Sequence, residues 1–340
     1  LSKKQENNLI CSFYWFQNRR MNYKEFNKIL ICPNCSSSVI ETTQGFSCSG
    51  ECKSNYPVYH EVPVMISPTN PVFNIADFAD ATPPAIFFNA YKNPVLQFLK
   101  KIRPDVTLNV VSKKNYAAIA LKLQSIKKPR ILIIGGSIDG KGIRALKDHL
   151  PANTILVESD VAHGPNTNII IDAHQIPFQD QCFDLVIAQA VLEHVLDPFL
   201  CVKEIHRVLK PGGFIYAETP FMQQVHGGKY DFHRFTHLGH RRLFRQFREE
   251  NSGLIAGAGS MMAWSLLYFI TSFSPNKKVD KALSYLGSFA SFWLKYFDYL
   301  LNQNKSSYDA ACGLFFLGIK EPNYLLPDQE LLSSYRGHKS

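Results

Sequence analysis

The chain has 340 residues, of which 46% are hydrophobic and 19% are charged, a balance that excludes an intrinsically disordered protein. The length allows one large core and a small accessory module. The formal net charge of +9 favours anionic partners such as nucleic acid, phosphorylated substrates or a membrane surface, without choosing among them.

The eight cysteines are unevenly distributed. Four fall in one short cluster, whereas Cys11, Cys182, Cys201 and Cys312 stand singly in apolar surroundings. This distribution favours a reducing compartment with one metal site over a secreted disulfide framework. The first thirty residues also lack the sustained apolar core of a secretory signal. We therefore expect a cytoplasmic protein.

The cysteine cluster consists of two short pairs. Cys32-Pro-Asn-Cys35 is followed, twelve residues later, by Cys48-Ser-Gly-Glu-Cys52. Two such pairs supply the four thiolates of a closed, tetrahedral Zn²⁺ site, which is structural because no coordination position stays open. The alternative, four ordinary small hydrophobic residues, is disfavoured because Pro and Gly stand where each pair needs a turn.

The residues after the cluster narrow the interpretation. Tyr56-Pro57-Val58 leads through a turn to Val62-Pro63-Val64. Together with the CPxC pair, this segment resembles the small zinc ribbon of the family that activates tRNA and protein methyltransferases. The resemblance implies a ribbon bearing a structural zinc ion. The connector that follows is rich in Pro and aromatic residues; we expect its second half to be helical and see no chemistry in it.

A doubly wound α/β sheet is predicted to begin at Ile131. The run Ile131–Ile134 is apolar and β-branched, a glycine-rich turn starts at Gly135, and a helical pattern starts at Ile143. A dinucleotide dehydrogenase is disfavoured because Ser137 replaces the second glycine of the G-x-G-x-x-G pattern. A P-loop is excluded because no Gly-Lys-Ser/Thr follows the strand.

Three further segments continue the sheet. A second strand ends in Glu158 and Asp160, and either acid can accept the ribose hydroxyls of a nucleotide. The segments "DAHQIPF" from Asp172, "FDLVIAQAVLEHV" from Phe183 and "VLKPGGFIYAETP" from Val208 then follow in order. This succession closely resembles class I methyltransferases that use S-adenosylmethionine (SAM), of the type that modifies small molecules and lipids.

The resemblance implies roles for the residues at the strand ends. The loop comprising Gly135, Gly136, Ser137, Asp139 and Gly140 would lie along the methionine part of SAM. Glu158 or Asp160 would hold the ribose, Asp172 and Ala173 would contact the adenine, and Gln189 would line the floor beneath the sulfonium. The family usually has an acid where Ile133 stands, so Asp139 is expected to contact the SAM amino group instead. The segment between the second and third strands is too short for a full helix.

The acceptor is expected to bind beyond the fifth strand, where ligands bind in such folds. The segment Pro220–Thr236 gathers acid/base and anion-binding groups: His226, Asp231, His233 and Arg234. With His194 just below the SAM site, these are the candidate catalytic residues, and His194 and His226 are the preferred bases. Local packing of His194 is the simpler alternative.

The last third of the chain contains a basic and an apolar stretch. Arg241, Arg242, Arg245 and Arg248 would form one cationic face on a helix. No charged residue occurs from Asn251 to Asn276. We expect a strand over Gly253–Gly259, an apolar helical hairpin within 251–311 and a last strand over Cys312–Gly318. The hairpin would cover the active site, dimerise, or lie peripherally on the inner membrane face beside the cationic helix; a true span is disfavoured.

The predicted fold is an α/β, Rossmann-like, seven-stranded class I methyltransferase sheet with a small N-terminal zinc ribbon and a C-terminal helical insertion. The expected parts are a tail (1–28), the ribbon (29–70), the connector (71–115), the methyltransferase domain (116–322) and a tail (323–340). The predicted cofactors are SAM and structural Zn²⁺.

Three functions remain open at this point. The first is methyl transfer to a small or lipid- or glycan-linked acceptor. The second, methylation of tRNA or protein, is disfavoured because Gln189-Ala190-Val191-Leu192 stands where amide and base N-methylating enzymes carry Asn-Pro-Pro-Tyr; nucleic acid is accordingly the weaker partner. The third is a non-catalytic binding module with the same fold.

Overall fold

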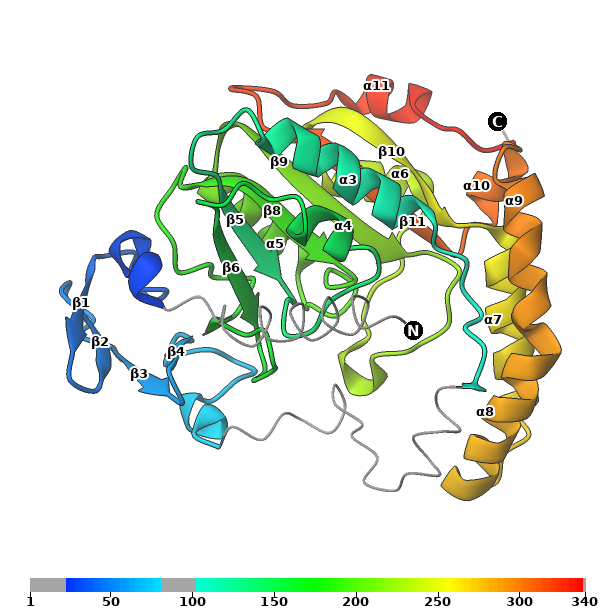
Figure 1. Cartoon of the computed structure of the whole chain (residues 1–340), viewed down its shortest axis with the longest axis horizontal. Coiled ribbons are helices and arrows are strands. Elements are labelled where there is room, and N and C mark those ends of the chain that lie inside the picture. The colour runs from blue at the N-terminus through cyan, green and yellow to red at the C-terminus, as the bar shows by residue number, and fades with distance from the viewer. Residues whose placement is uncertain (1–22, 81–101, 339–340) are drawn as a thin grey trace, which may run out of the picture.

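The computed structural model describes residues 23–80 and 102–338. One twisted sheet runs through the molecule, with helices on both of its faces (Figure 1). Most of the predicted first tail, and the connector residues 81–101, lie outside the described residues.

The predicted Rossmann-like half forms seven neighbouring strands in the order β7-β6-β5-β8-β9-β11-β10. Five of these strands are parallel, and β11 lies antiparallel between β9 and β10. Their bounds are β5 (Arg130–Ile134), β6 (Ile155–Asp160), β7 (Ile169–Ile171), β8 (Phe183–Gln189), β9 (Leu209–Pro220), β10 (Arg248–Ala256) and β11 (Gly313–Ile319). Because the parallel strands all end at one edge, their carboxyl-terminal residues are brought together there.

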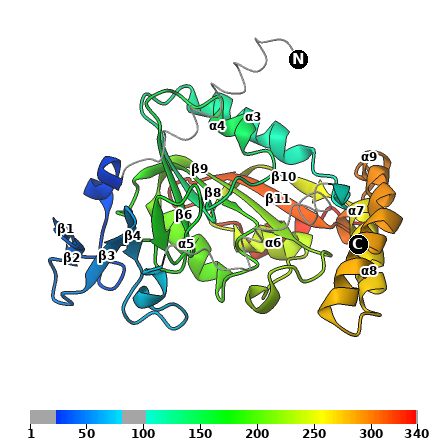
Figure 2. The same cartoon turned by 60° about the horizontal axis from the view of Figure 1, so that its bottom comes forward.

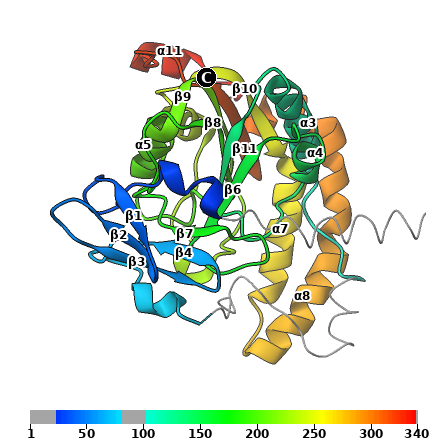
Figure 3. The same ribbon diagram turned by 60° about the vertical axis from the view of Figure 1, so that its left-hand side comes forward.

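The prediction of a seven-stranded sheet was wrong in its count, because the described part of the chain forms an eleven-stranded sheet. The four added strands come from the cysteine-bearing segment: β1 (Val39–Thr42), β2 (Gly45–Cys48), β3 (Asn55–Tyr59) and β4 (Val62–Met65). The last of them pairs in parallel with β7, with Val64 opposite Ile170 and Met65 opposite Ile171. Figure 3 shows β4 and β7 side by side. All residues of β4 are buried, so the pairing removes an apolar edge from water.

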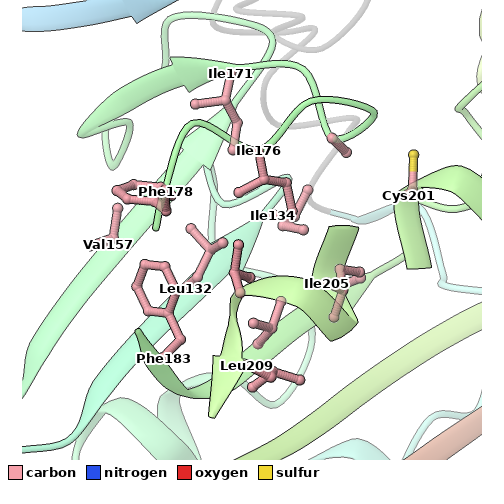
Figure 4. Packing of buried hydrophobic residues seen from close by; sticks show 14 of the residues in the cluster. Leu132, Ile134, Val157, Ile171, Ile176, Phe178, Phe183, Cys201, Ile205 and Leu209 are labelled. Atoms are coloured by element: carbon pink, nitrogen blue, oxygen red, sulfur yellow. The ribbon is translucent and has the colours of Figure 1, made fainter. Parts of the chain in front are cut away.

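The helices cover the two faces of the sheet separately (Figure 2). On one face α3 (Val111–Leu123) and α4 (Arg144–Lys147) lie over a cluster that includes Ile119, Ile131 and Leu185. On the other face lie α5 (Pro198–Val208) and α6 (His237–Leu243). Leu132, Phe183 and Ile205 pack together there (Figure 4). The alternation of inward residues along β5 therefore serves two cores, as a strand buried on both faces requires.

Two of the predicted boundaries shift in the structure. The strand expected at Gly253–Gly259 is β10, which begins and ends earlier, and α3 begins at Val111, inside the predicted connector. No helix stands between β6 and β7, as the short connecting segment predicted. The last strand, β11, is displaced by only one residue from the predicted Cys312–Gly318.

The apolar stretch forms the expected helical hairpin from α7 (Ala258–Thr271) and α8 (Lys277–Ser291), at the end of the molecule opposite the cysteine segment (Figure 1). A 3-10 turn, η5 (Phe292–Phe297), and three short helices complete the chain: α9 (Asp298–Leu301), α10 (Ser306–Asp309) and α11 (Asp328–Ser333). Within the described residues, no helix has both the length and the apolar character needed to cross a bilayer.

The arginine stretch does not form the predicted cationic face. Helix α6 ends at Leu243, so Arg245 lies beyond it and Arg248 lies in β10. Arg241 is buried, donates to the carbonyls of Phe244 and Phe247, and pairs with Glu249 at 3.0 Å. Periodicity alone missed this outcome because a buried guanidinium that binds backbone carbonyls leaves no periodic signal in the sequence.

A buried aspartate fixes the start of α7. Asp298 is 1% exposed and accepts hydrogen bonds from the backbone N–H groups of Gly257 (3.1 Å) and Gly259 (2.7 Å) and from the Ser260 hydroxyl (2.6 Å). Because three donors would lose their acceptor, we expect Asp298→Ala to lower the free energy of unfolding by about 2–4 kcal/mol. Urea denaturation measures this loss, with the exposed Asp280→Ala as the control, which should stay within about 0.5 kcal/mol of the wild type.

Candidate active site

A cavity of about 960 Å³ opens at the carboxyl ends of the parallel strands. Its walls come from the glycine-rich loop after β5, the ends of β6 to β9, the segment after β9 and Trp264 of α7. The position agrees with the rule that ligands bind outside the carboxyl ends of such strands. All ten predicted cofactor-binding residues line it: Gly135, Gly136, Ser137, Asp139, Gly140, Glu158, Asp160, Asp172, Ala173 and Gln189.

The turn after β5 requires glycine. Gly135 has a φ of +73°, and a Cβ on it would lie 2.4 Å from Cγ2 of Val191. The N–H of Gly136 donates to the carbonyl of Ser159, which ties the loop to β6. The backbone of the loop therefore forms a wall of the cavity without intervening side chains.

The two acids of β6 have different partners. Asp160 accepts a hydrogen bond from the N–H of Ser137 at 3.1 Å. Burial raises the pKa of Asp160, and the backbone N–H groups of Ser137, Val161 and Ala162 oppose that shift. Its carboxylate is thus committed to holding the backbone of the loop. Glu158 instead pairs with Lys147 through a single oxygen, at 2.6 Å.

Asp139 is held by side chains on the same wall of the cavity. It lies 2.5 Å from the ammonium group of Lys147 and 3.5 Å from Arg144, and it accepts a hydrogen bond from Asn166 at 3.1 Å. Asp139 and Glu158 thus share Lys147. Because Asp139 has three side-chain partners, it is less available for the amino-group contact expected from the sequence.

Asp172 is fixed from both sides. One oxygen accepts from the backbone N–H (2.9 Å) and from Nδ1 of His174 (2.6 Å), and the other accepts from Asn70 (2.6 Å). Burial acts to raise the pKa of Asp172, but the hydrogen bonds from His174 outweigh it, so the pKa lies below its usual value. A residue of the cysteine-bearing segment therefore holds an acid of the cavity.

A polar network forms the floor beside β8. Gln189 accepts from the hydroxyl of Tyr116 (3.1 Å) and donates to Glu218 (2.9 Å) and to the carbonyl of Lys141 (3.0 Å). Glu218 is buried and also accepts from Ser112 at 2.6 Å; burial raises its pKa despite these hydrogen bonds. Sequence reasoning missed Glu218, although an acid at the end of an apolar strand is a usable signal.

His194 and His226 meet at the far side of the cavity. Their ring centroids are 5.0 Å apart, and both rings face the buried carboxylate of Glu193. A Cβ on Gly227 would lie 2.4 Å from Cε1 of His194, so a larger residue there would displace the ring. The structure thus unites two of the predicted catalytic residues and adds Glu193, which was not singled out.

The other three predicted catalytic residues lie outside the cavity lining. Asp231 accepts from the N–H groups of His226 (2.7 Å) and Gly227 (3.1 Å), and it pairs with Arg234. Arg234 also donates to the carbonyls of Gln223 and Gln224, and Nε2 of His233 lies 3.2 Å from the carbonyl of Leu196. Their observed contacts position the segment that carries His226.

Residues of the predicted connector, in which we expected no chemistry, also line the cavity. Pro71, Val72 and Phe73 line the cavity beside Asn70, and Asp105, Thr107 and Asn109 line it near α7. Trp264 donates to the hydroxyl of Thr107 at 2.8 Å. Asn70 to Phe73 follow β4, whose pairing with β7 was not predicted from the sequence.

The four predicted metal-binding cysteines lie together in the segment that carries β1 to β4, at the end of the molecule opposite the α7–α8 hairpin. The sulfur atoms of Cys32, Cys35, Cys48 and Cys52 lie within 4.8 Å of one another. Neighbouring pairs are 3.3–3.5 Å apart, and the N–H of Gly50 points at the sulfur of Cys48. The arrangement is compatible with a zinc ribbon.

Comparison with known proteins finds similarity in the part of the chain whose strand ends line the cavity. Residues 133–217 match the family described as a methyltransferase domain. A ubiquinone/menaquinone biosynthesis C-methyltransferase of Xylella fastidiosa is 30% identical over 124 residues, 35% of this chain and 44% of that protein. A malonyl-[acyl-carrier protein] O-methyltransferase of Marinomonas sp. is 38% identical over 55 residues, 16% of this chain and 20% of that protein.

Among solved structures, the phosphoethanolamine N-methyltransferase 2 of Haemonchus contortus, in complex with SAM, aligns at 18% identity with a TM-score of 0.38. The alignment covers 61% of this chain and 52% of that one. The chain spans less than half the length of the two curated relatives named above. Residues 133–217 thus correspond to a methyltransferase domain, and the rest of the chain lies outside that match.

Proposed function

We propose that the protein transfers a methyl group from SAM to a small or lipid- or glycan-linked acceptor. The observation that carries the proposal is the single cavity that joins the glycine-rich loop and the strand-end acids to the histidine cluster. A cofactor and an acceptor placed there would lie next to each other, and methyl transfer depends on that alignment.

The residues of the cavity fit SAM. The glycine loop would lie along the methionine part, Glu158 would accept the ribose hydroxyls, and Asp172 with Ala173 would contact the adenine. Glu158 is assigned in preference to Asp160 because Asp160 is already committed to backbone N–H groups. When bound, SAM supplies the activated methyl group. The fixed carboxylates and loop backbone position it without needing to rearrange.

Apolar side chains favour a hydrophobic acceptor. Val195, Leu196 and Phe232, which are near His194 and His226 in the sequence, line the cavity, and so does Trp264 of α7. The two curated relatives are named for ubiquinone/menaquinone biosynthesis and for malonyl-[acyl-carrier protein], which supports a small or carrier-linked acceptor. We assign Trp264 and the start of α7 to the wall of the cavity, which favours the covering role of the hairpin over dimer or membrane contact.

We also propose that the four cysteines hold a structural Zn²⁺. Zinc–sulfur bonds of about 2.3 Å in a tetrahedron place sulfur atoms roughly 3.8 Å apart, close to the separations found. The hydrogen bonds to Cys48 and Cys52 from Gly50 and Ser54 suit thiolates. Four protein ligands exclude a role in the reaction itself.

Methylation of tRNA or protein is the second candidate function, and non-catalytic binding by a module of the same fold is the third. Gln189 is held by Tyr116 and Glu218, and the sequence after it differs from the Asn-Pro-Pro-Tyr pattern. Glu158 is assigned to the ribose hydroxyls. It therefore does not replace the acid that the family usually carries where Ile133 stands, which contacts the SAM amino group.

Calorimetry with SAM and S-adenosylhomocysteine tests the proposal. We expect both to bind in the micromolar range, and Gly135→Val, which places a side chain against Val191, to abolish binding of both. If neither SAM nor S-adenosylhomocysteine bound to the folded wild-type chain, the proposal of a SAM-dependent enzyme would be wrong. Retention on liposomes compared with tRNA at graded salt then separates the acceptor classes, since phosphate-backbone binding falls steeply with salt.

A further inference from the structure

We infer that Glu193, His194 and His226 bind a divalent transition-metal ion beside the proposed methyl acceptor. The three residues come from the turn after β8 and from the segment after β9, and all three line the cavity. The site is distinct from the four-cysteine cluster in position and in ligand chemistry, because its donors are nitrogen and oxygen and not sulfur.

The spacing of the donor atoms suits a metal ion. Oε1 of Glu193 lies 3.5 Å from Nε2 of His226 and 3.8 Å from Nε2 of His194, and one donor atom from each residue lies within 4.8 Å of the others. An ion bonded at about 2.0–2.2 Å to each donor would hold them roughly 3.0–3.6 Å apart. A closure of a few tenths of an ångström brings Glu193 into this range with each imidazole, and the donor atoms of the two imidazoles lie within 4.8 Å of each other.

Glu193 supplies a second, independent reason. Its side chain is 0% exposed, and neither carboxylate oxygen has a hydrogen-bond partner among the described residues. Burying a carboxylate costs several kcal/mol unless its charge is compensated, and the imidazoles of His226 and His194 do so only when protonated. A cation held between Glu193 and the two imidazoles compensates that charge directly.

The imidazoles are oriented for binding a metal. Nδ1 of His194 lies 2.9 Å from the carbonyl of Tyr230, and Nδ1 of His226 lies 3.3 Å from the carbonyl of Gln224. A carbonyl only accepts, so each Nδ1 carries a proton, and Nε2, which is directed at Glu193, is the nitrogen that would bind a metal ion. Metal-bound histidines generally donate their second nitrogen in this way.

The backbone that carries the ligands is itself braced. Asp231 holds the N–H groups of His226 and Gly227, and the main-chain carbonyl of Glu193 accepts from the N–H groups of Phe232 and His233. This explains why a charged pair, Asp231 and Arg234, sits behind the cavity without lining it. We class both as positioning residues.

Three protein ligands leave coordination positions open, in contrast to a closed structural site. The open side faces the cavity, where the ion would bind an oxygen of the acceptor and lower the pKa of a hydroxyl or enol. This role, unlike the metal binding itself, depends on the proposed function. It favours an acceptor whose methylated atom carries or adjoins such an oxygen.

Binding of Mn²⁺ and Ni²⁺ to the zinc-loaded full chain tests the inference, because Mn²⁺ suits carboxylate ligands, Ni²⁺ suits imidazole, and zinc already occupies the four thiolates. We expect saturable binding to the wild type by calorimetry and electron paramagnetic resonance. Binding should weaken by about 10-fold or more in Glu193→Gln and in His226→Ala. His149→Ala, at an exposed histidine outside the cavity, should bind as the wild type does.

Thermal unfolding measurements show whether each variant is folded. Mn²⁺ should raise the Tm of the wild type but not that of Glu193→Gln, which we expect to fold at least as well without metal because it removes a buried charge. The inference would be overturned if neither Mn²⁺ nor Ni²⁺ bound the wild type, or if both bound Glu193→Gln as they bind the wild type. SAM calorimetry on the same samples separates this failure from failure of the proposed function, since each ligand is measured independently.

Discussion

Zinc removal is expected to weaken SAM binding by about 10-fold or more, although the four cysteines lie far from the glycine loop. A structural zinc ion contributes on the order of 10 kcal/mol to the folding of so small a unit, so its loss unfolds the ribbon. Strand β4 then leaves β7, and Asn70 no longer holds Asp172. The substitution Cys48→Ser reproduces the effect without a chelator.

Zinc content, calorimetry with SAM and amide hydrogen exchange at Ile169–Ile171 measure the three steps separately. Asn70→Ala isolates the last step: it should keep the zinc and lose only part of the affinity, because one hydrogen bond of about 1 kcal/mol is removed. Cys182→Ala, at a buried cysteine outside the cluster, is the matched control and should retain zinc. A zinc-free chain that bound SAM with wild-type affinity would show that ribbon and cavity are uncoupled.

Glu158→Gln is expected to weaken SAM binding by about 10- to 100-fold with little loss of stability. A carboxylate that accepts hydroxyl groups contributes about 1.5–3 kcal/mol, and the amide keeps the shape while losing the charge. Lys147 retains Asp139 as a partner, which limits the structural damage. Titration calorimetry gives the affinity and urea unfolding gives the stability.

Asp160→Asn is the matched comparison on the same face of the same strand. Its carboxylate holds the N–H of Ser137, so we expect the free energy of unfolding to fall by about 1–3 kcal/mol and the affinity to fall less than in Glu158→Gln. The reverse ranking of the two affinities would assign the ribose to Asp160.

The sequence predicted the central strands because their signals are local. A β-branched run, glycines at a tight turn and an acid at each strand end are determined by neighbours in the chain. The same locality explains why all ten predicted cofactor-binding residues line one cavity. Their individual roles needed the structure, because the difference between Glu158 and Asp160 lies in partners from other elements.

Errors arose where distant segments meet. The pairing of β4 with β7 joins residues more than a hundred positions apart, so nothing near Val64 announces it. Arg241 and the arginines that follow it have helical spacing in the sequence. However, the guanidinium of Arg241 donates to the carbonyls of Phe244 and Phe247 and pairs with Glu249. Glu193 was overlooked beside His194 because burial without a partner cannot be read from residue type.

The pairing of β4 with β7 also bears on how this protein can be divided. A fragment beginning at residue 116 would contain every strand of the Rossmann-like half but would leave Ile169, Ile170 and Ile171 as an open, wholly apolar sheet edge. Such an edge is a template for pairing with other chains, so the fragment should aggregate where the longer chain does not. We therefore expect that strands β1 to β4 must be retained for the Rossmann-like half to stay soluble, and that a truncation should keep the two together.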